Sequence, residues 1–355
     1  MTSDSRCRPP LFLLLFFITA SAAAAQNAPT IKGQELPTSA RAVAFSSDGR
    51  YLYTASPTSF AKWNIASGQR MAAIRLNAGQ IDNFAIDHQR NRALLSGYIG
   101  QAPSGFMHGI LDLNLFGTNS STSPTNDIKR NKAISSLGYS TRTIEVHADL
   151  NLYSFGINKQ IVFLDAKTLK IIGKRPTHFS TTHSVVIARN ASRALKRDGD
   201  AILGYDLRKK APLPELIGHP GGTEYLHISD DGKRALTSGS NSFAMWDVET
   251  GRELFRRKAF TGFKDRWGGT VSIPIARILA VTGDLRYFVT GAERLYVYDT
   301  KHHRLIAELP GLDDTKSHHA DYRQEVSFSL DGTLIAATGK KKILVWNISS
   351  VLQAP

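Results

Sequence analysis

The sequence predicts an all-β fold, a seven-bladed β-propeller built from four-stranded antiparallel blades. Three observations predict it: a repeating strand–turn–strand pattern, seven occurrences of an aromatic or aliphatic residue followed by Asp or Asn, and a short N-terminal segment able to complete the last blade. Self-similarity with a period of roughly 40–45 residues is typical of propeller blades. Because the repeats cover nearly all of residues 26–355, we expect a single domain there.

The repeat is clearest in residues 40–75, 223–257 and 324–349. Each copy contains three runs in which apolar and polar residues alternate, as in half-buried strands. Glycine accepts the positive φ that tight hairpins require. We therefore expect hairpin turns at the three pairs that separate the first two runs: Asp48-Gly49, Asp231-Gly232 and Asp331-Gly332.

The third strand of each blade is predicted to end in an aromatic or aliphatic residue followed by Asp or Asn. Successive Asp or Asn residues of these pairs are 41 to 53 residues apart (206 − 165 = 41; 165 − 112 = 53). The shortest spacings agree with the blade period, and the longer ones predict insertions in loops. The seven pairs are Trp63-Asn64, Leu111-Asp112, Leu164-Asp165, Tyr205-Asp206, Trp246-Asp247, Tyr298-Asp299 and Trp346-Asn347.

Two of these features carry a resemblance to known propellers. Gly218-His219 and Trp246-Asp247 match the Gly-His and Trp-Asp signatures of a WD repeat, and residues 152–175 look like a YVTN-type blade. The chain therefore resembles WD-repeat and YVTN-type seven-bladed propellers, in particular secreted bacterial members. The resemblance implies that His219, Ser238 and Trp246 join a structural hydrogen-bond network in blade five. It also implies structural roles for Trp63, Trp346, Asp165, Asp206, Asp247 and Asp299.

Closure of the ring is predicted to use the N-terminal segment. Blade one has an outer strand after its third strand, whereas the seventh repeat has no such segment before the chain ends. Residues 30–36 have the right length to replace it, so we expect them to pair with the outer edge of blade seven. The blades would then occupy about residues 40–351, and no exposed sheet edge would remain at the seam.

The first 25 residues have the features of a cleaved secretion signal. Arg6 and Arg8 precede an apolar run over residues 11–20, and small residues follow over 21–25. The run is shorter than the ~20 residues of an ordinary membrane span. Export to the periplasm or the medium is therefore predicted, with an uncleaved anchor or a buried core segment as the alternatives.

Cysteine content and charge restrict the chemistry. Cys7 is the only cysteine and would leave with the signal, which excludes cysteine nucleophiles, cysteine–metal sites and c-type haem from the mature chain. The formal net charge of +14 favours an anionic partner or adhesion to an anionic surface, and the alternative is that it only keeps an exported protein soluble. No motif for specific nucleic-acid binding is present.

Three insertions are predicted on one face of the ring. Residues 101–107 lie between the second and third strands of blade two, and residues 259–272 and 311–323 lie between consecutive blades. Both kinds of connection leave a propeller from the same face. A fourth insertion, residues 116–131, has no face assigned by the sequence.

The residues of this face are candidates for partner binding. Aromatic and basic side chains suit sugar, aromatic or anionic ligands through stacking and cation–π contact, and Trp267 has the alternative role of a lid or plug at the channel mouth. We expect a protein, peptide or glycan ligand to contact Phe263, Arg266, Trp267, His318, His319, Tyr322 and Arg323.

An enzyme is the alternative interpretation. His318, His319 and Asp321 could bind a metal ion at the channel mouth of a lactonase-like hydrolase or an oxidoreductase. Adjacent histidines on an extended segment point in opposite directions, which disfavours a shared ion. No nucleophile motif or phosphate-binding loop is present, so no catalytic residue and no cofactor is predicted. A binding scaffold is therefore the favoured function, and the oligomeric state is left open.

Overall fold

The protein is described by a computed structural model. Its described residues are 33–38, 40–57, 59–75, 79–99, 107–114, 129–130, 144–157, 159–177, 185–239, 242–258, 261–264, 270–272, 278–291, 294–310, 325–339 and 341–352. The predicted signal, residues 1–25, lies outside them.

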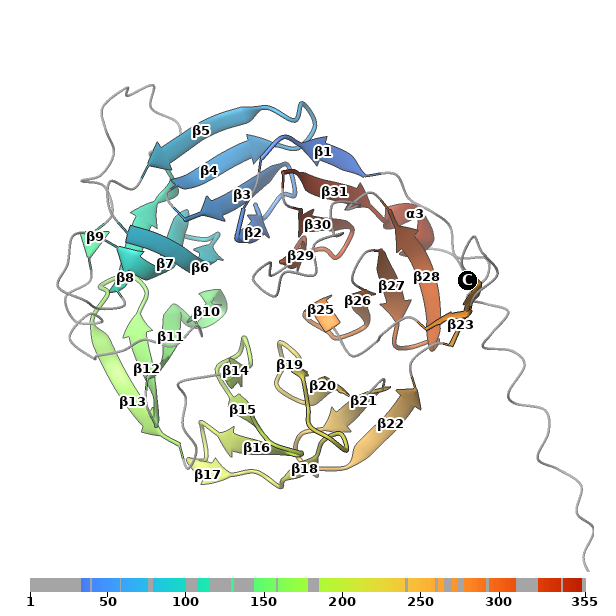
Figure 1. Ribbon diagram of the computed structural model, residues 1–355. Helices are drawn as coiled ribbons and strands as arrows, with labels where there is room; N and C mark the ends of the chain where they lie inside the picture. Colours follow the sequence, from blue (N-terminus) through green and yellow to red (C-terminus); the bar gives the residue numbers. More distant parts are fainter. Residues whose placement is uncertain are drawn as a thin grey trace, which may run out of the picture.

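Seven antiparallel sheets stand side by side in a ring, which confirms the predicted seven-bladed β-propeller (Figure 1). Blades one to three are β2 (Ala42–Phe45), β3 (Tyr51–Ser56), β4 (Ser59–Asn64) and β5 (Arg70–Arg75); β6 (Gly79–Asp87), β7 (Arg92–Ile99), β8 (Met107–Asp112) and β9 (Lys129–Arg130); and β10 (Ile144–His147), β11 (Leu152–Ile157), β12 (Gln160–Asp165) and β13 (Ile171–Pro176). A 3-10 turn, η3 (Ala148–Leu150), follows β10.

Blade four differs in its outer edge, which is split into two short strands that both pair with its third strand. Its strands are β14 (Val185–Ile187), β15 (Arg193–Asp198), β16 (Ala201–Asp206), β17 (Ala211–Pro212) and β18 (Leu216–Ile217). Blades five and six are β19 (Tyr225–Ile228), β20 (Arg234–Gly239), β21 (Ser242–Asp247) and β22 (Glu253–Lys258), and β25 (Ile278–Val281), β26 (Tyr287–Gly291), β27 (Leu295–Asp299) and β28 (Arg304–Leu309).

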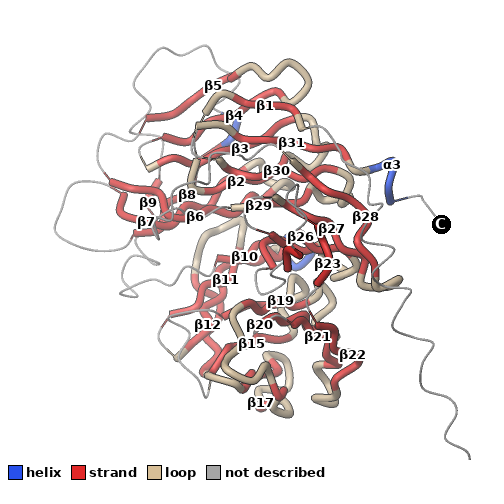
Figure 2. Tube along the Cα trace, turned by 45° about the vertical axis from the view of Figure 1, so that its right-hand side comes forward, coloured by secondary structure: helices blue, strands red, loops and turns tan. Residues whose placement is uncertain are grey.

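The N-terminal strand closes the ring, as predicted. Blade seven has the strand order β1–β31–β30–β29, with β1 (Gln34–Leu36), β29 (Val326–Phe328), β30 (Leu334–Thr338) and β31 (Ile343–Asn347). Gln34 lies opposite Val345 and Leu36 opposite Ile343. The Leu36 side chain is fully buried among residues of blades seven and one. A short helix, α3 (Ser349–Leu352), follows β31 outside the ring (Figure 2).

Hydrophobic side chains gather between the blades. Seven clusters are present among the described residues, and each joins residues of two neighbouring blades. One of them joins Phe45 and Trp63 of blade one to Ala336 and Val345 of blade seven. Burial of apolar surface therefore stabilises every interface of the ring, the closing interface included.

All seven predicted Asp or Asn residues end the third strand of their blade. In each case the side-chain Oδ1 accepts a hydrogen bond from a backbone N–H two or three residues later, at 2.6–3.3 Å. This local bond turns the chain toward the fourth strand in blades one to six, and toward α3 in blade seven, which explains why the residue type recurs. The positions predicted as structural, Asp165, Asp206, Asp247 and Asp299, follow this rule.

The hydrogen-bond network of blade five differs from the prediction in one residue. Nε2 of His219 forms a hydrogen bond with Oγ1 of Thr237 at 2.9 Å, and Nε1 of Trp246 donates to the same oxygen at 2.9 Å. Thr237 rather than Ser238 therefore supplies the bridging hydroxyl, because successive residues of a strand point to opposite faces. Ser238 is buried beside it. Burial and the nearby Arg256 lower the pKa of His219 to about 4, so its ring is neutral at pH 7.

The three predicted tryptophans differ in their partners. Nε1 of Trp63 donates to Oγ1 of Thr54 at 3.1 Å, the position that Thr237 occupies in blade five. In blade seven the corresponding residue is Ala337, and the buried Nε1 of Trp346 has no hydrogen-bond partner among the described residues. A single hydroxyl therefore determines whether the indole is paired.

Replacing Thr237 tests this network. Thr237→Val keeps the shape but removes the hydrogen-bond partner of both Nε2 of His219 and Nε1 of Trp246, so we expect the free energy of unfolding to fall by about 1–3 kcal/mol. Thr54→Val in blade one removes the partner of one donor and should cost about half as much. Chemical denaturation of both variants measures the difference, and equal losses would contradict the bridging role of Thr237.

Candidate ligand site at the channel mouth

The strand order gives the propeller two different faces. Connections between first and second strands, and between third and fourth strands, lie at one end of the blades, which we call the turn face. Connections between second and third strands, and between consecutive blades, lie at the other end, which we call the insertion face. The strands that flank residues 101–107, 259–272 and 311–323 reach the insertion face, in agreement with the predicted common face.

Of the predicted partner residues, only Phe263 lies within the described part of the chain. Part of residues 259–272 is a two-stranded hairpin, β23 (Thr261–Lys264) and β24 (Thr270–Ser272), where a loop was expected. Phe263 lies in β23, opposite Val271. The other candidates, Arg266, Trp267, His318, His319, Asp321, Tyr322 and Arg323, lie outside the described residues, and their roles stay predictions.

The fourth insertion can be assigned to a face. Residues 116–131 start after β8 and include β9, the outer strand of blade two. The insertion thus connects a third to a fourth strand, so its ends lie at the turn face.

The turn face contains the larger of two adjoining cavities among the described residues. Its volume is about 650 Å³, and the second, of about 470 Å³, shares Arg189, Ile228, Asp230 and Leu330 with it. Every blade contributes the first residue of the turn between its first and second strands. We call these residues the rim: Ser47, His88, Ala148, Arg189, Asp230, Gly283 and Leu330.

The rim follows from a shared turn geometry. The residue before each rim residue pairs with the residue five positions later, and a residue with φ between 51° and 72° lies inside each turn. Gly49, Gly232 and Gly332 occupy this position at the predicted Asp-Gly turns, with φ of 67°, 72° and 72°. Their conformation explains the sequence signal.

A second set of positions lies on the inner strands, three residues before each rim residue in the sequence. We call these positions the wall. Its seven residues are Ala44, Ala85, Glu145, Val186, His227, Ala280 and Ser327. Five of them are small or aliphatic, whereas blade three has a glutamate and blade five a histidine. Both of these side chains line the larger cavity.

Burial changes the protonation of both wall residues. Desolvation, reinforced by the Asp230 carboxylate and opposed by Arg189, raises the pKa of Glu145 to about 8. Desolvation lowers the pKa of His227 to about 4, against a weak hydrogen bond to the Ile278 carbonyl at 3.5 Å. At pH 7 both side chains are therefore mostly neutral.

The pKa of the rim residue His88 is lowered, like that of His227. Desolvation and the Arg189 guanidinium lower its pKa, and Asp87 and Asp48 oppose the shift. The charge of Arg189 thus lowers the pKa values of both His88 and Glu145.

The lining of the two cavities is acidic. It contains five carboxyl groups, one guanidinium group and two histidines whose pKa values are lowered. Those groups are Glu145, Asp149, Asp230, Asp284 and Asp331, with Arg189, His88 and His227. Since the whole chain has a net charge of +14, the mouth has the opposite sign from the protein as a whole.

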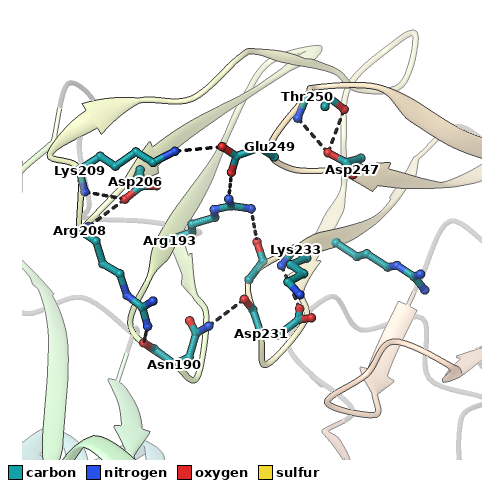
Figure 3. Close-up of polar contacts among 12 residues, drawn as sticks. Asn190, Arg193, Asp206, Arg208, Lys209, Asp231, Lys233, Asp247, Glu249 and Thr250 are labelled. Atoms are coloured by element: carbon teal, nitrogen blue, oxygen red, sulfur yellow. Dashed lines mark hydrogen bonds and ion pairs between the residues drawn. The ribbon is translucent and has the colours of Figure 1, made fainter.

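Polar bonds fix the turns that carry the charged rim residues (Figure 3). Nδ2 of Asn190 donates to the Asp231 carbonyl at 2.7 Å, and Nη1 of Arg193 donates to the Gly232 carbonyl at 2.9 Å. Glu249 pairs with both Arg193 and Lys209. Blades four and five are thus joined beside the mouth, so Arg189 and Asp230 project from a well-supported edge.

The two charged rim residues also contact each other. Nη1 of Arg189 lies 3.5 Å from Oδ2 of Asp230. The Arg189 carbonyl bonds with Nδ1 of His147 at 2.6 Å, which fixes the turn from the neighbouring blade. The ion pair is partly exposed, so it is weak and can open toward a ligand.

Glu145 and His227 were not among the site residues predicted from the sequence. A signal was present: counting back from the turn in each repeat shows that only these two blades have a titratable residue at the wall position. The repeats of blades three and four lack an Asp-Gly turn, so this alignment needed the strand register.

Two other features bear on the possible chemistry. Within the described part of the chain, no group of three or more His, Cys, Asp or Glu side chains is placed to hold a metal ion. No helix among the described residues is long and apolar enough to cross a membrane.

Fold and mouth together define a seven-bladed β-propeller with a charged cavity at one end of its channel. No protein-family model matches the chain. The resemblance to WD-repeat and YVTN-type propellers therefore stays a prediction from the sequence motifs, and the propeller fold is what the structure shows.

Proposed function

We propose that this propeller is a binding scaffold that recognises a ligand at the channel mouth of its turn face. The observation that carries the proposal is the cavity of about 650 Å³ into which two titratable wall residues and a charged rim project. Concave sites with a few converging polar groups are the usual form of ligand pockets. Export, predicted from residues 1–25, is compatible with this function.

Catalysis is the second candidate, and one observation favours it. Glu145 and His227 line one cavity, with pKa values displaced in opposite directions, and such pairs are typical of acid–base sites. Binding remains the better proposal, because Ser47, the one hydroxyl residue in the lining of the larger cavity, has no hydrogen bond to a base among the described residues. A nucleophile activated in this way is what hydrolytic chemistry requires.

A fluorophore on the rim tests the proposed site. Cys7 is the only cysteine, so Cys7→Ser combined with Ser47→Cys gives one thiol at the mouth for labelling. We expect its emission to change with at least one of three probes: Nα-acetyl-lysine amide, citrate or glucose. The matched control combines Cys7→Ser with Glu215→Cys, whose thiol lies at the exposed outer edge of blade four.

Site-specific response is the outcome that distinguishes binding at the mouth. A change at position 47 without a change at position 215 supports the proposal. No response to any probe at position 47, or equal responses at the two positions, would overturn it.

A further inference from the structure

We propose that the channel mouth recognises an alkylammonium group, carried by a lysine side chain or by a free polyamine, with Glu145 as its anchor. This inference rests on the proposed function and adds the chemical class of the ligand. It starts from the contrast between a basic protein and an acidic cavity. Long-range repulsion by the net charge of +14 would disfavour a cation unless the site itself had strong negative potential.

The Glu145 carboxyl group is the first part of the case. It is partly buried and lines the larger cavity, and among the described residues no donor forms a hydrogen bond with it. A carboxyl group that is partly removed from water and has no donor is unfavourable. An ammonium group with three donors would supply what the site lacks.

The neighbouring groups favour a cation over an anion. Asp149 and Asp230 line the cavity with Glu145, and Asp284 and Asp331 extend the acidic surface into the adjoining cavity. Arg189 is the one guanidinium in this lining, and it already contacts Asp230. An anionic ligand would meet one positive charge and up to five carboxylates.

The geometry also suits a linear cation. The rim includes Leu330, whose side chain is 59% exposed, and the small residues Ala148 and Gly283. An alkyl chain can pack against Leu330 while its terminal nitrogen reaches the wall. Lysine stems commonly bury their methylene groups in this manner.

Binding should change the protonation of Glu145. At pH 7 the carboxyl group is mostly protonated, because its pKa is about 8. An ammonium beside it lowers that pKa, so the proton leaves for the buffer as the ion pair forms. The charged and titratable groups that surround it in the cavity are Arg189, Asp230, Asp149, His88 and His227.

Calorimetry of the full chain tests the inference. Titration at pH 7 with Nα-acetyl-lysine amide in two buffers of different ionisation enthalpy measures proton release directly. We expect close to one proton released per bound amine, and at least tenfold weaker binding to Glu145→Gln with no proton release. Glu215→Gln makes the same chemical change at an exposed site and should bind like wild type.

Comparison of ligands separates the sources of the amine. Nα,Nε-diacetyl-lysine amide has the same stem without the charge and should bind at least tenfold more weakly. Tighter binding of a lysine-containing tripeptide than of spermidine identifies a protein side chain as the source, and the reverse identifies a free polyamine.

The inference and the proposed function can fail separately. Citrate or glucose binding at the rim fluorophore without any binding of the amines overturns the inference and leaves the scaffold function intact. Equal affinity of wild type and Glu145→Gln for the lysine amide also overturns the anchor role. No response to any probe overturns the site as well.

Discussion

Starting the chain at Ala40 should lower the free energy of unfolding by roughly 5 kcal/mol relative to a chain that starts at Gln26. The shorter chain lacks β1, which pairs with β31 at three positions and places Leu36 in the core between blades seven and one. Each ladder hydrogen bond contributes ~1 kcal/mol, and full burial of a leucine contributes ~2 kcal/mol. Chemical denaturation of the two chains measures the loss.

A point variant checks that closure, rather than chain length, is responsible. Leu36→Asp places a charge in a fully buried position and should reproduce most of the loss. Glu35→Gln removes only the exposed ion pair with Lys342, at 2.7 Å, and should cost less than about 1 kcal/mol. Unchanged stability of the chain that starts at Ala40 would show that the ring does not depend on its N-terminal strand.

Glu145→Gln should stabilise the protein at alkaline pH and leave its stability at pH 4 nearly unchanged. The folded-state pKa of about 8 lies above the usual value of 4.5, so the folded state holds a proton that the unfolded state has lost between these values. The penalty for charging Glu145 is absent below pH 4.5, grows as pH rises and is complete above pH 8. We expect a gain of about 2–4 kcal/mol at pH 8.5.

The diagnostic quantity is the difference in free energy of unfolding between Glu145→Gln and the wild type, measured as a function of pH. His219 and His227, with pKa values lowered to about 4, destabilise both proteins as pH falls below 6.5 and cancel when the two curves are subtracted. Glu215→Gln should give a flat difference curve. A flat curve for Glu145→Gln as well would mean that the carboxyl group ionises in the channel without penalty.

Local chemistry explains what the sequence could predict. Each blade repeats two short-range devices: an Asp or Asn that bonds to the next turn, and a turn residue with positive φ. Both depend on neighbours within a few positions, so they appear as sequence patterns. Ring closure was predictable by counting strands, because one blade lacked its fourth.

Long-range placement explains what the sequence could not. The wall residues Glu145 and His227 are separated by 82 positions (227 − 145 = 82) and meet at one cavity only because blades three to five are consecutive in the ring. The wrong prediction of Ser238 as the partner of His219 has a similar cause. The strand register decides whether the side chain of residue 237 or of residue 238 faces His219, and the sequence motif does not fix that register.

The net charge of the chain also did not reveal how charged residues are distributed over the surface. A net charge of +14 favours an anionic partner for the surface as a whole, and that prediction still applies to the insertion face. The mouth differs, because the carboxyl groups of four turns and one inner strand line its two cavities, while most lysines and arginines lie elsewhere in the chain. Among the lining residues, Arg189 is the one strong base.

A crystal structure of the full chain soaked with Nα-acetyl-lysine amide examines the recognition site most directly. The expected result is density for the ligand in the turn-face cavity, with its ammonium nitrogen within hydrogen-bond distance of the Glu145 carboxylate and its stem against Leu330. Density confined to the insertion face, or an empty mouth at saturating ligand, would contradict the assignment.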